Sequence, residues 1–151
     1  MTKSRYTLYL SGATTANATQ VVSFTYDLRT LIPLSKRGKK FLLLSAFDTS
    51  DQGVIVHSAL QVGINIVPQY NQSSPPSQYI TLGIAQPVYC SGLNGASARF
   101  KYSYPETSYL AKMIEYPEID TINVQITSVS GIALAVGTFS LYLSFEEMSD
   151  E

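Results

Sequence analysis

Few side chains of this 151-residue chain are suited to acid–base or nucleophilic chemistry, and they stand apart in the sequence. His57 is the only histidine and Cys90 the only cysteine. A catalytic base needs a nucleophile and an orienting acid within hydrogen-bond reach. Because His57 falls on the polar side of an alternating segment and Cys90 in a different element, we expect a surface histidine, no catalytic site and no enzyme.

The segment Asp48–Gly53 contains two carboxylates, the kind of ligand that a calcium ion prefers. An EF-hand loop would also need oxygen ligands at alternating positions and a distal glutamate, which this segment lacks. A single cysteine leaves no intramolecular disulfide and no cysteine-based zinc site. The segment Gly92–Gly95 is followed by neither the lysine nor the helical pattern of a phosphate-binding loop. We therefore predict plain turns here, with no metal and no cofactor.

One predicted strand carries an aromatic row with basic residues between its members: Phe100, Tyr102, Tyr104, Arg99 and Lys101. Aromatic rings beside basic side chains can stack on sugar rings or on unpaired bases. Rings on one face of a strand also fill a core or a subunit contact, which is the favoured interpretation. The alternative is a carbohydrate- or receptor-binding module that uses Tyr102 and Tyr104, or the polar loop around Asn71.

The surface is predicted to be polar but weakly charged. The formal net charge is −1 and charged residues make up 14% of the chain, against about 25% in typical soluble domains. Proteins that coat nucleic acid neutralise phosphates with a basic arm or face, but the first twelve residues hold only Lys3 and Arg5. We expect no strong nucleic-acid binding, and a surface suited to packing against neighbouring subunits.

The basic residues gather only in the turn Lys36–Lys40, where Gly38 permits a tight turn. Lysines at such a place can serve as a solvated turn before an apolar strand. They can also form an anionic contact, for instance with the acidic tail of a neighbouring subunit: Glu146, Glu147, Asp150 and Glu151. The first interpretation is favoured and the second stays open.

Apolar and polar residues alternate with period two through most of the chain, which is typical of strands with one buried face. Breaks at Ser11–Gly12 and Gln86–Pro87 are predicted to end two of the strands, and Gly63 to mark a bulge. Residues 106–116 form either a helix or an extra strand over residues 109–115. The eight predicted strands comprise seven that begin near Arg5, Gln20, Lys40, Val54, Tyr79, Arg99 and Thr121 and one that ends near Phe145.

These strands predict one all-β domain over residues 1–151, an antiparallel eight-stranded jelly-roll sandwich with at most one short helix. The segment Phe41–Phe47 is apolar on both faces, so we expect it to be covered by the partner sheet and also by a loop or another subunit. No apolar run approaches the roughly 18 residues of a membrane span. No secretory signal follows Met1.

The chain closes with two alternating segments folded back on each other, Thr121–Gly131 and Thr138–Glu146, with the sequences TINVQITSVSG and TFSLYLSFE. They resemble the last two strands of viral jelly-roll capsid proteins of the double-stranded DNA virus lineage, where the final strand reads aromatic-x-Leu-x-Leu-x-Phe-Glu. The chain is too short for the two jelly rolls of that lineage's major capsid proteins. It also lacks the basic packaging arm that is usual in capsid proteins of small RNA viruses.

The resemblance implies a structural protein of the virion, a single jelly-roll capsid subunit. A penton subunit at the vertex, or a minor capsid or cement protein, would fit its size. The implied partners are copies of the same chain, in a pentamer or a trimer, and other capsid proteins.

Overall fold

The computed structural model describes residues 4–50, 52, 59–66, 79–90, 97–103, 112–117 and 119–148. Antiparallel strands dominate these residues, with one short helix and one 3-10 turn. In chain order the elements are β1 (Arg5–Thr14), β2 (Thr19–Thr25), α1 (Leu28–Leu31), the 3-10 turn η1 (Leu34–Lys36), β3 (Lys40–Thr49), β4 (Leu60–Ile64), β5 (Ile80–Cys90), β6 (Ser97–Tyr102), β7 (Lys112–Glu115), β8 (Thr121–Ser128) and β9 (Gly137–Glu147).

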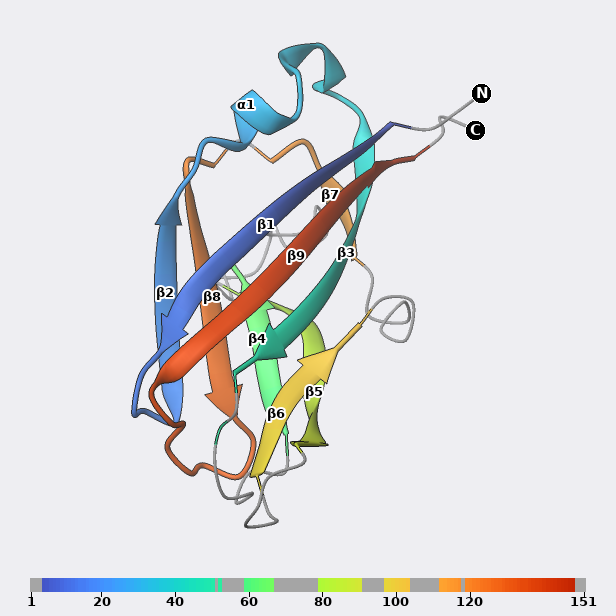
Figure 1. Ribbon diagram of the computed structural model, residues 1–151. Helices are drawn as coiled ribbons and strands as arrows, with labels where there is room; N and C mark the ends of the chain where they lie inside the picture. The colour runs from blue at the N-terminus through green and yellow to red at the C-terminus, as the bar shows by residue number, and fades with distance from the viewer. Residues whose placement is uncertain are drawn as a thin grey trace.

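The strands pair in a nested order, first with last. Strand β1 pairs with β9, β2 with β8, β3 with β6 and β7, and β4 with β5. Additional pairing of β9 with β3 and of β8 with β4 completes two layers, and Figure 1 shows β1, β9 and β3 crossing in front of β8 and β4. This nesting is the arrangement of a jelly roll, so the predicted fold class is confirmed.

Strand β5 joins the two layers along one side of the sandwich. Its first half, through Ala85, pairs with β4, and its second half, from Gln86, pairs with β6. The prediction that Gln86–Pro87 ends this strand is wrong, because the proline lies where the strand changes partners. On the opposite side β1 and β2 are the two ends of the strand order, so each pairs with only one strand among the described residues.

Strands β8 and β9 are consecutive but belong to different layers. Strand β8 lies between β2 and β4, whereas β9 lies between β1 and β3. The predicted alternation of both strands is confirmed, but they face each other across the core and do not form a hairpin. The ladder partners come from distant parts of the chain, which a local pattern does not specify.

Strands β6 and β7 take successive stretches of the same edge of β3. Strand β6 pairs with Phe47 and Asp48, and β7 pairs with residues 40–43. Of the two predictions for residues 106–116, strand β7 supports the extended one, and residues 104–111 lie outside the described part. The predicted long strand from Val54 is described only as β4, with the expected irregularity between Val62 and Gly63.

The alternation that begins at Gln20 continues to Leu28 in the sequence, but the strand itself ends at Thr25. Asp27 accepts a hydrogen bond from the Arg29 amide and so begins the short helix α1. The first strand, in contrast, continues through Ser11 and Gly12 to Thr14. A Cβ at Gly12 would lie 2.8 Å from the ring of buried Phe139, so this glycine makes room for an aromatic ring.

The core lies between the inward faces of the two layers, and its large buried side chains come from nearly every strand. Strand β3 also buries Leu44 on its outer face, where Leu42 and Ala46 are half-buried. Double burial is thus confirmed for Leu44. The fully buried large side chains are Phe41, Phe100, Phe139, Phe145, Leu28, Ile32, Leu43, Leu60, Ile64, Ile114, Ile122 and Ile126.

Gly83 on β5 makes room for Tyr102 of β6, because a Cβ there would lie 2.7 Å from the tyrosine ring. We expect Gly83→Ala to reduce the free energy of unfolding by about 1–3 kcal/mol through overpacking. Urea denaturation measures this loss. In a Tyr102→Leu background the same substitution should cost distinctly less, because the clashing ring is gone. Equal costs in both backgrounds would contradict this packing.

Candidate functional site

The residues suited to catalysis or metal binding are not brought together in the described part of the chain. Asp48 lies near the end of β3, where Oδ2 is 3.7 Å from Nη1 of Arg99 and both side chains are over 40% exposed. Within the described ranges, no group of three or more His, Cys, Asp or Glu side chains is placed to hold a metal ion. His57, Asp51 and the side chain of Cys90 lie outside the described residues.

The aromatic row of β6 points into the core. Phe100 and Tyr102 are 1% and 4% exposed, while Lys101 between them is exposed. The favoured interpretation is therefore confirmed for these two rings. The alternative placement of a sugar platform on Tyr102 is wrong, because its ring is covered by the opposite sheet. Tyr104 and the loop around Asn71 lie outside the described residues.

Tyr102 is held in place by a polar contact as well as by packing. Its ring stacks on Phe47 with the centroids 6.0 Å apart, and its hydroxyl shares a 2.7 Å hydrogen bond with the Ser45 hydroxyl. Burial raises the pKa of Tyr102 well above the ordinary 10.0, and the hydrogen bond from Ser45 opposes the rise only in part. The phenol therefore stays neutral in the folded protein.

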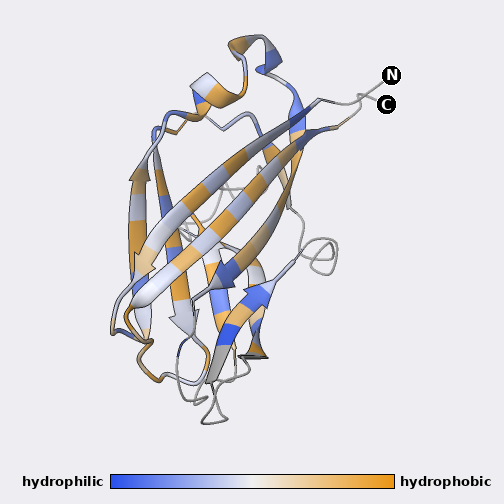
Figure 2. Ribbon diagram, in the orientation of Figure 1, coloured by the Kyte–Doolittle hydropathy of each residue, from blue (hydrophilic) through white to orange (hydrophobic). Residues whose placement is uncertain are grey.

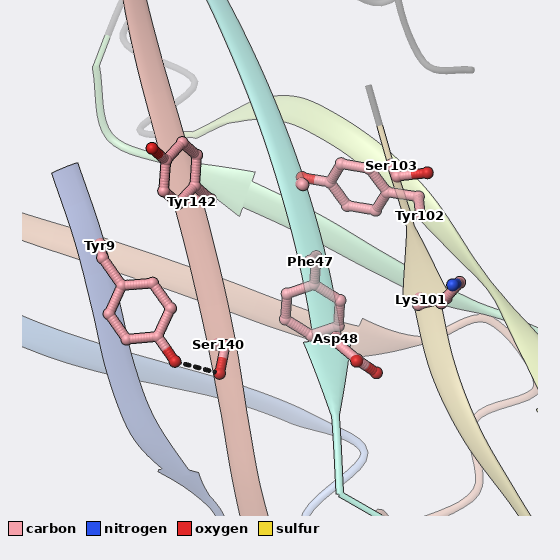
Figure 3. A pocket seen from close by; sticks show the side chains of 9 residues that line it. Tyr9, Phe47, Asp48, Lys101, Tyr102, Ser103, Ser140 and Tyr142 are labelled. Atoms are coloured by element: carbon pink, nitrogen blue, oxygen red, sulfur yellow. Dashed lines mark hydrogen bonds between the residues drawn. The ribbon is translucent and has the colours of Figure 1, made fainter. Parts of the chain in front are cut away.

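Two exposed tyrosines lie instead on the outer face of β1 and β9. Tyr9 and Tyr142 are 59% and 46% exposed and stand opposite each other in the ladder. Figure 3 shows the Tyr9 hydroxyl directed at Ser140, at 2.7 Å. The alternation puts both tyrosines opposite the apolar side chains of their strands, but no motif in the sequence marks them as site residues. An aromatic residue on the polar face of each of two alternating segments is the pattern that could have identified this pair.

Shallow hollows lie on either side of Tyr142. One, of about 220 Å³, is lined by Tyr9, Asp48, Lys101 and Ser140 among others. The other, of about 140 Å³, lies over Leu44 and Ser144. Ring faces next to carboxylate and hydroxyl groups can hold a sugar or a polar protein side chain.

The loop between β8 and β9 presents apolar side chains to solvent. Residues 129–136 contain no charge, and Val129, Ile132 and Val136 are 57%, 42% and 78% exposed. The loop lies at the end of the molecule away from the termini, and Figure 2 colours much of it as hydrophobic. Three exposed apolar side chains on one uncharged loop make it a candidate interaction site.

This apolar loop is anchored to the rest of the fold. Leu134 is 2% exposed, and its amide donates to the Asn17 carbonyl at 3.2 Å. The Thr14 hydroxyl donates to the Ala135 carbonyl at 2.8 Å, and the Ala135 amide donates to Gln52 Oε1 at 2.9 Å. The exposed side chains are therefore presented on a fixed backbone.

The opposite end of the sandwich is charged, and its charges pair within the chain. Nζ of Lys36 is 3.0 Å from Oε2 of Glu147, and Nη2 of Arg5 is 3.5 Å from Oε2 of Glu146. Lys36 and Glu147 thus meet within one chain, and docking of the acidic tail on the basic turn of a neighbour stays a prediction. Gly38 has a φ of 87°, as expected for a tight turn.

Comparison with known proteins gives little guidance. No family model matches the chain, and no curated protein matches it. Among solved structures, the crystal structure of the infectious bursal disease virus VP2 subviral particle is 11% identical, with a TM-score of 0.21. The match covers 97% of this chain and 42% of that one. A similarity of that size carries no argument. No helix among the described residues is long and apolar enough to cross a membrane.

The buried phenol of Tyr102 predicts a pH dependence. Because the folded state retains this proton to higher pH than the unfolded state, the free energy of unfolding should fall above about pH 10, by up to about 1.4 kcal/mol per pH unit. Tyr102→Phe should flatten this fall, and near neutral pH it should cost about 1 kcal/mol through loss of the Ser45 bond.

Urea denaturation at a series of pH values measures both effects. Tyr9→Phe is the matched control, because it removes a phenol from the exposed face of β1 and leaves the buried phenol in place. Identical slopes for wild type and Tyr102→Phe would contradict the raised pKa of Tyr102.

Proposed function

We propose that this protein is a structural subunit of a virion, a single jelly-roll capsid protein of the penton, minor capsid or cement type, which assembles into a pentameric or trimeric ring. The observation that carries the proposal is the anchored apolar loop of residues 129–136. Burying its side chains against a neighbouring subunit would contribute roughly 25 cal/mol per Å² of apolar area. Because the backbone is already fixed, little ordering entropy opposes the association.

Two further features support a role in assembly rather than in chemistry. The closing strands carry the resemblance to viral jelly-roll capsid proteins, and the fold is one that capsid proteins use. Jelly rolls also serve lectins and cupins, so the fold alone does not decide the function. We propose that the protein has no enzymatic activity.

The ring contact is tested by the double substitution Ile132→Asp and Val136→Asp. We expect wild type to sediment as a ring and the double variant to lose the ring, because two carboxylates would have to be buried at the contact. Analytical ultracentrifugation gives the mass, and negative-stain electron microscopy shows the shape.

The control for this experiment is Leu34→Asp, which alters an exposed apolar side chain of η1 at the charged end of the sandwich, away from the loop. It should leave the ring intact. A wild-type protein that stays no larger than a dimer across a wide concentration range would contradict the proposed ring. A ring unaffected by the double substitution would exclude this loop as its contact.

A second candidate function is binding of a glycan at the hollow beside Tyr9 and Tyr142. The favouring observation is an exposed pair of rings next to Asp48, whose side chain is 43% exposed. A sugar hydroxyl could donate to Oδ2 of that carboxylate while its ring stacks on Tyr142.

The glycan candidate predicts that Tyr142→Ala and Asp48→Asn each weaken binding at least tenfold. The measurement is binding to a glycan array, followed by titration of any glycan that binds. Tyr79→Ala, which lies just before β5 and does not line the hollow, serves as the control. Absence of binding by wild type would remove this candidate and leave the assembly proposal untouched.

A further inference from the structure

Strand β1 has a backbone edge without a strand partner in the described part of the chain. It lies at one end of the strand order and pairs with β9 alone. The Glu147 amide donates to the Ser4 carbonyl at 2.9 Å, which fixes the phase of that ladder. Because antiparallel pairs alternate between bonded and non-bonded positions, the even-numbered residues of β1 bond to β9. The odd-numbered residues therefore point their amides and carbonyls away from it.

This edge lacks the features that usually prevent strands from pairing between molecules. Natural edges are protected by lysine, proline, bulges or short length. From Tyr6 to Thr14 there is neither a charged residue nor a proline, and the ten-residue ladder with β9 runs without a register shift. Thr7, Tyr9 and Ser11 are exposed along it. The edge is thus long, regular and open to an extended strand.

We propose that β1 pairs with β1 of a second copy of this chain, antiparallel and about a two-fold axis at Tyr9. The pattern of the edge is self-complementary under this operation. Tyr9 would stand opposite the second Tyr9, and Thr7 opposite Ser11, so that each outward amide of one copy meets an outward carbonyl of the other.

Charge favours the antiparallel arrangement over a parallel one. Arg5, the only charged residue of β1, would lie opposite Ala13 of the second copy and remote from the second Arg5. A parallel pair would set the two arginines side by side, which is unfavourable. The two-fold pair also places the exposed rings of Tyr142 and Tyr9 in one row across both copies, where cross-strand aromatic pairs contribute to stability.

This contact is separate from the proposed ring contact, since it uses the side of the sandwich and not the loop of residues 129–136. It is therefore tested in the Ile132→Asp and Val136→Asp background, which lacks the proposed ring contact. In that background the chain should dimerise through β1 alone. Sedimentation velocity and native mass spectrometry measure the dimer fraction.

Tyr9→Lys and Tyr9→Glu are each introduced into this background. Each variant alone should dimerise at least tenfold more weakly, because like charges meet at the axis. An equimolar mixture of the two should recover the dimer as a heterodimer, and this recovery should weaken with added salt. Recovery also shows that both variants are folded.

The matched control is Val21→Lys, which places a lysine on the other open edge, β2, and should leave the dimer unchanged. A monomeric background protein, or equal effects of Tyr9→Lys and Val21→Lys, would overturn the inference. Neither outcome bears on the ring, which is measured on the wild-type chain. A wild-type protein that forms only the dimer would overturn the ring and support the β1 contact.

Discussion

The layer formed by β1, β9, β3 and β6 depends on strand β9, which pairs with both β1 and β3. Its amides and carbonyls alternate between two neighbours: the Glu147 amide bonds toward β1 at Ser4, and the Thr138 carbonyl accepts a bond from Ser50 beyond β3. Side chains alternate in the same way, so Leu141 and Leu143 enter the core while Tyr142 faces out. A shift of one residue would exchange the two faces, and burial of the apolar face therefore fixes the register.

This constraint explains why so much of the sandwich could be predicted. Period-two alternation identified most strands of the described core and put Leu8 and Leu10 on the opposite face from Tyr9. It could not identify partners, because each ladder joins residues far apart in the chain. Strands β8 and β9 share the same local pattern and yet lie in opposite layers. The predictions that strands end at Gly12 and at Pro87 were also wrong. Gly12 makes room for the ring of Phe139, and Pro87 lies where β5 changes partners.

The candidate site was harder to predict than the fold. Alternation correctly put Phe100 and Tyr102 on one face, but it could not say whether that face was inward until the opposite sheet was known. Tyr102 can face inward because Gly83, which has no side chain, leaves room for its ring. In the loop of residues 129–136, Leu134 and Val136 are both strongly apolar, yet Leu134 is buried and Val136 is exposed. The difference arises from hydrogen bonds to Asn17 and Gln52, which come from distant segments.

The distribution of charge suggests which forces can drive association. At the charged end, Lys36 and Arg5 already pair with Glu147 and Glu146 of the same chain, so these groups offer little to a partner. Exposed ion pairs contribute only about 0–1 kcal/mol in any case. The apolar loop and the open β1 edge, in contrast, still have surface and hydrogen-bonding groups to bury. Association through them would rest on apolar burial and backbone hydrogen bonds, which depend little on ionic strength.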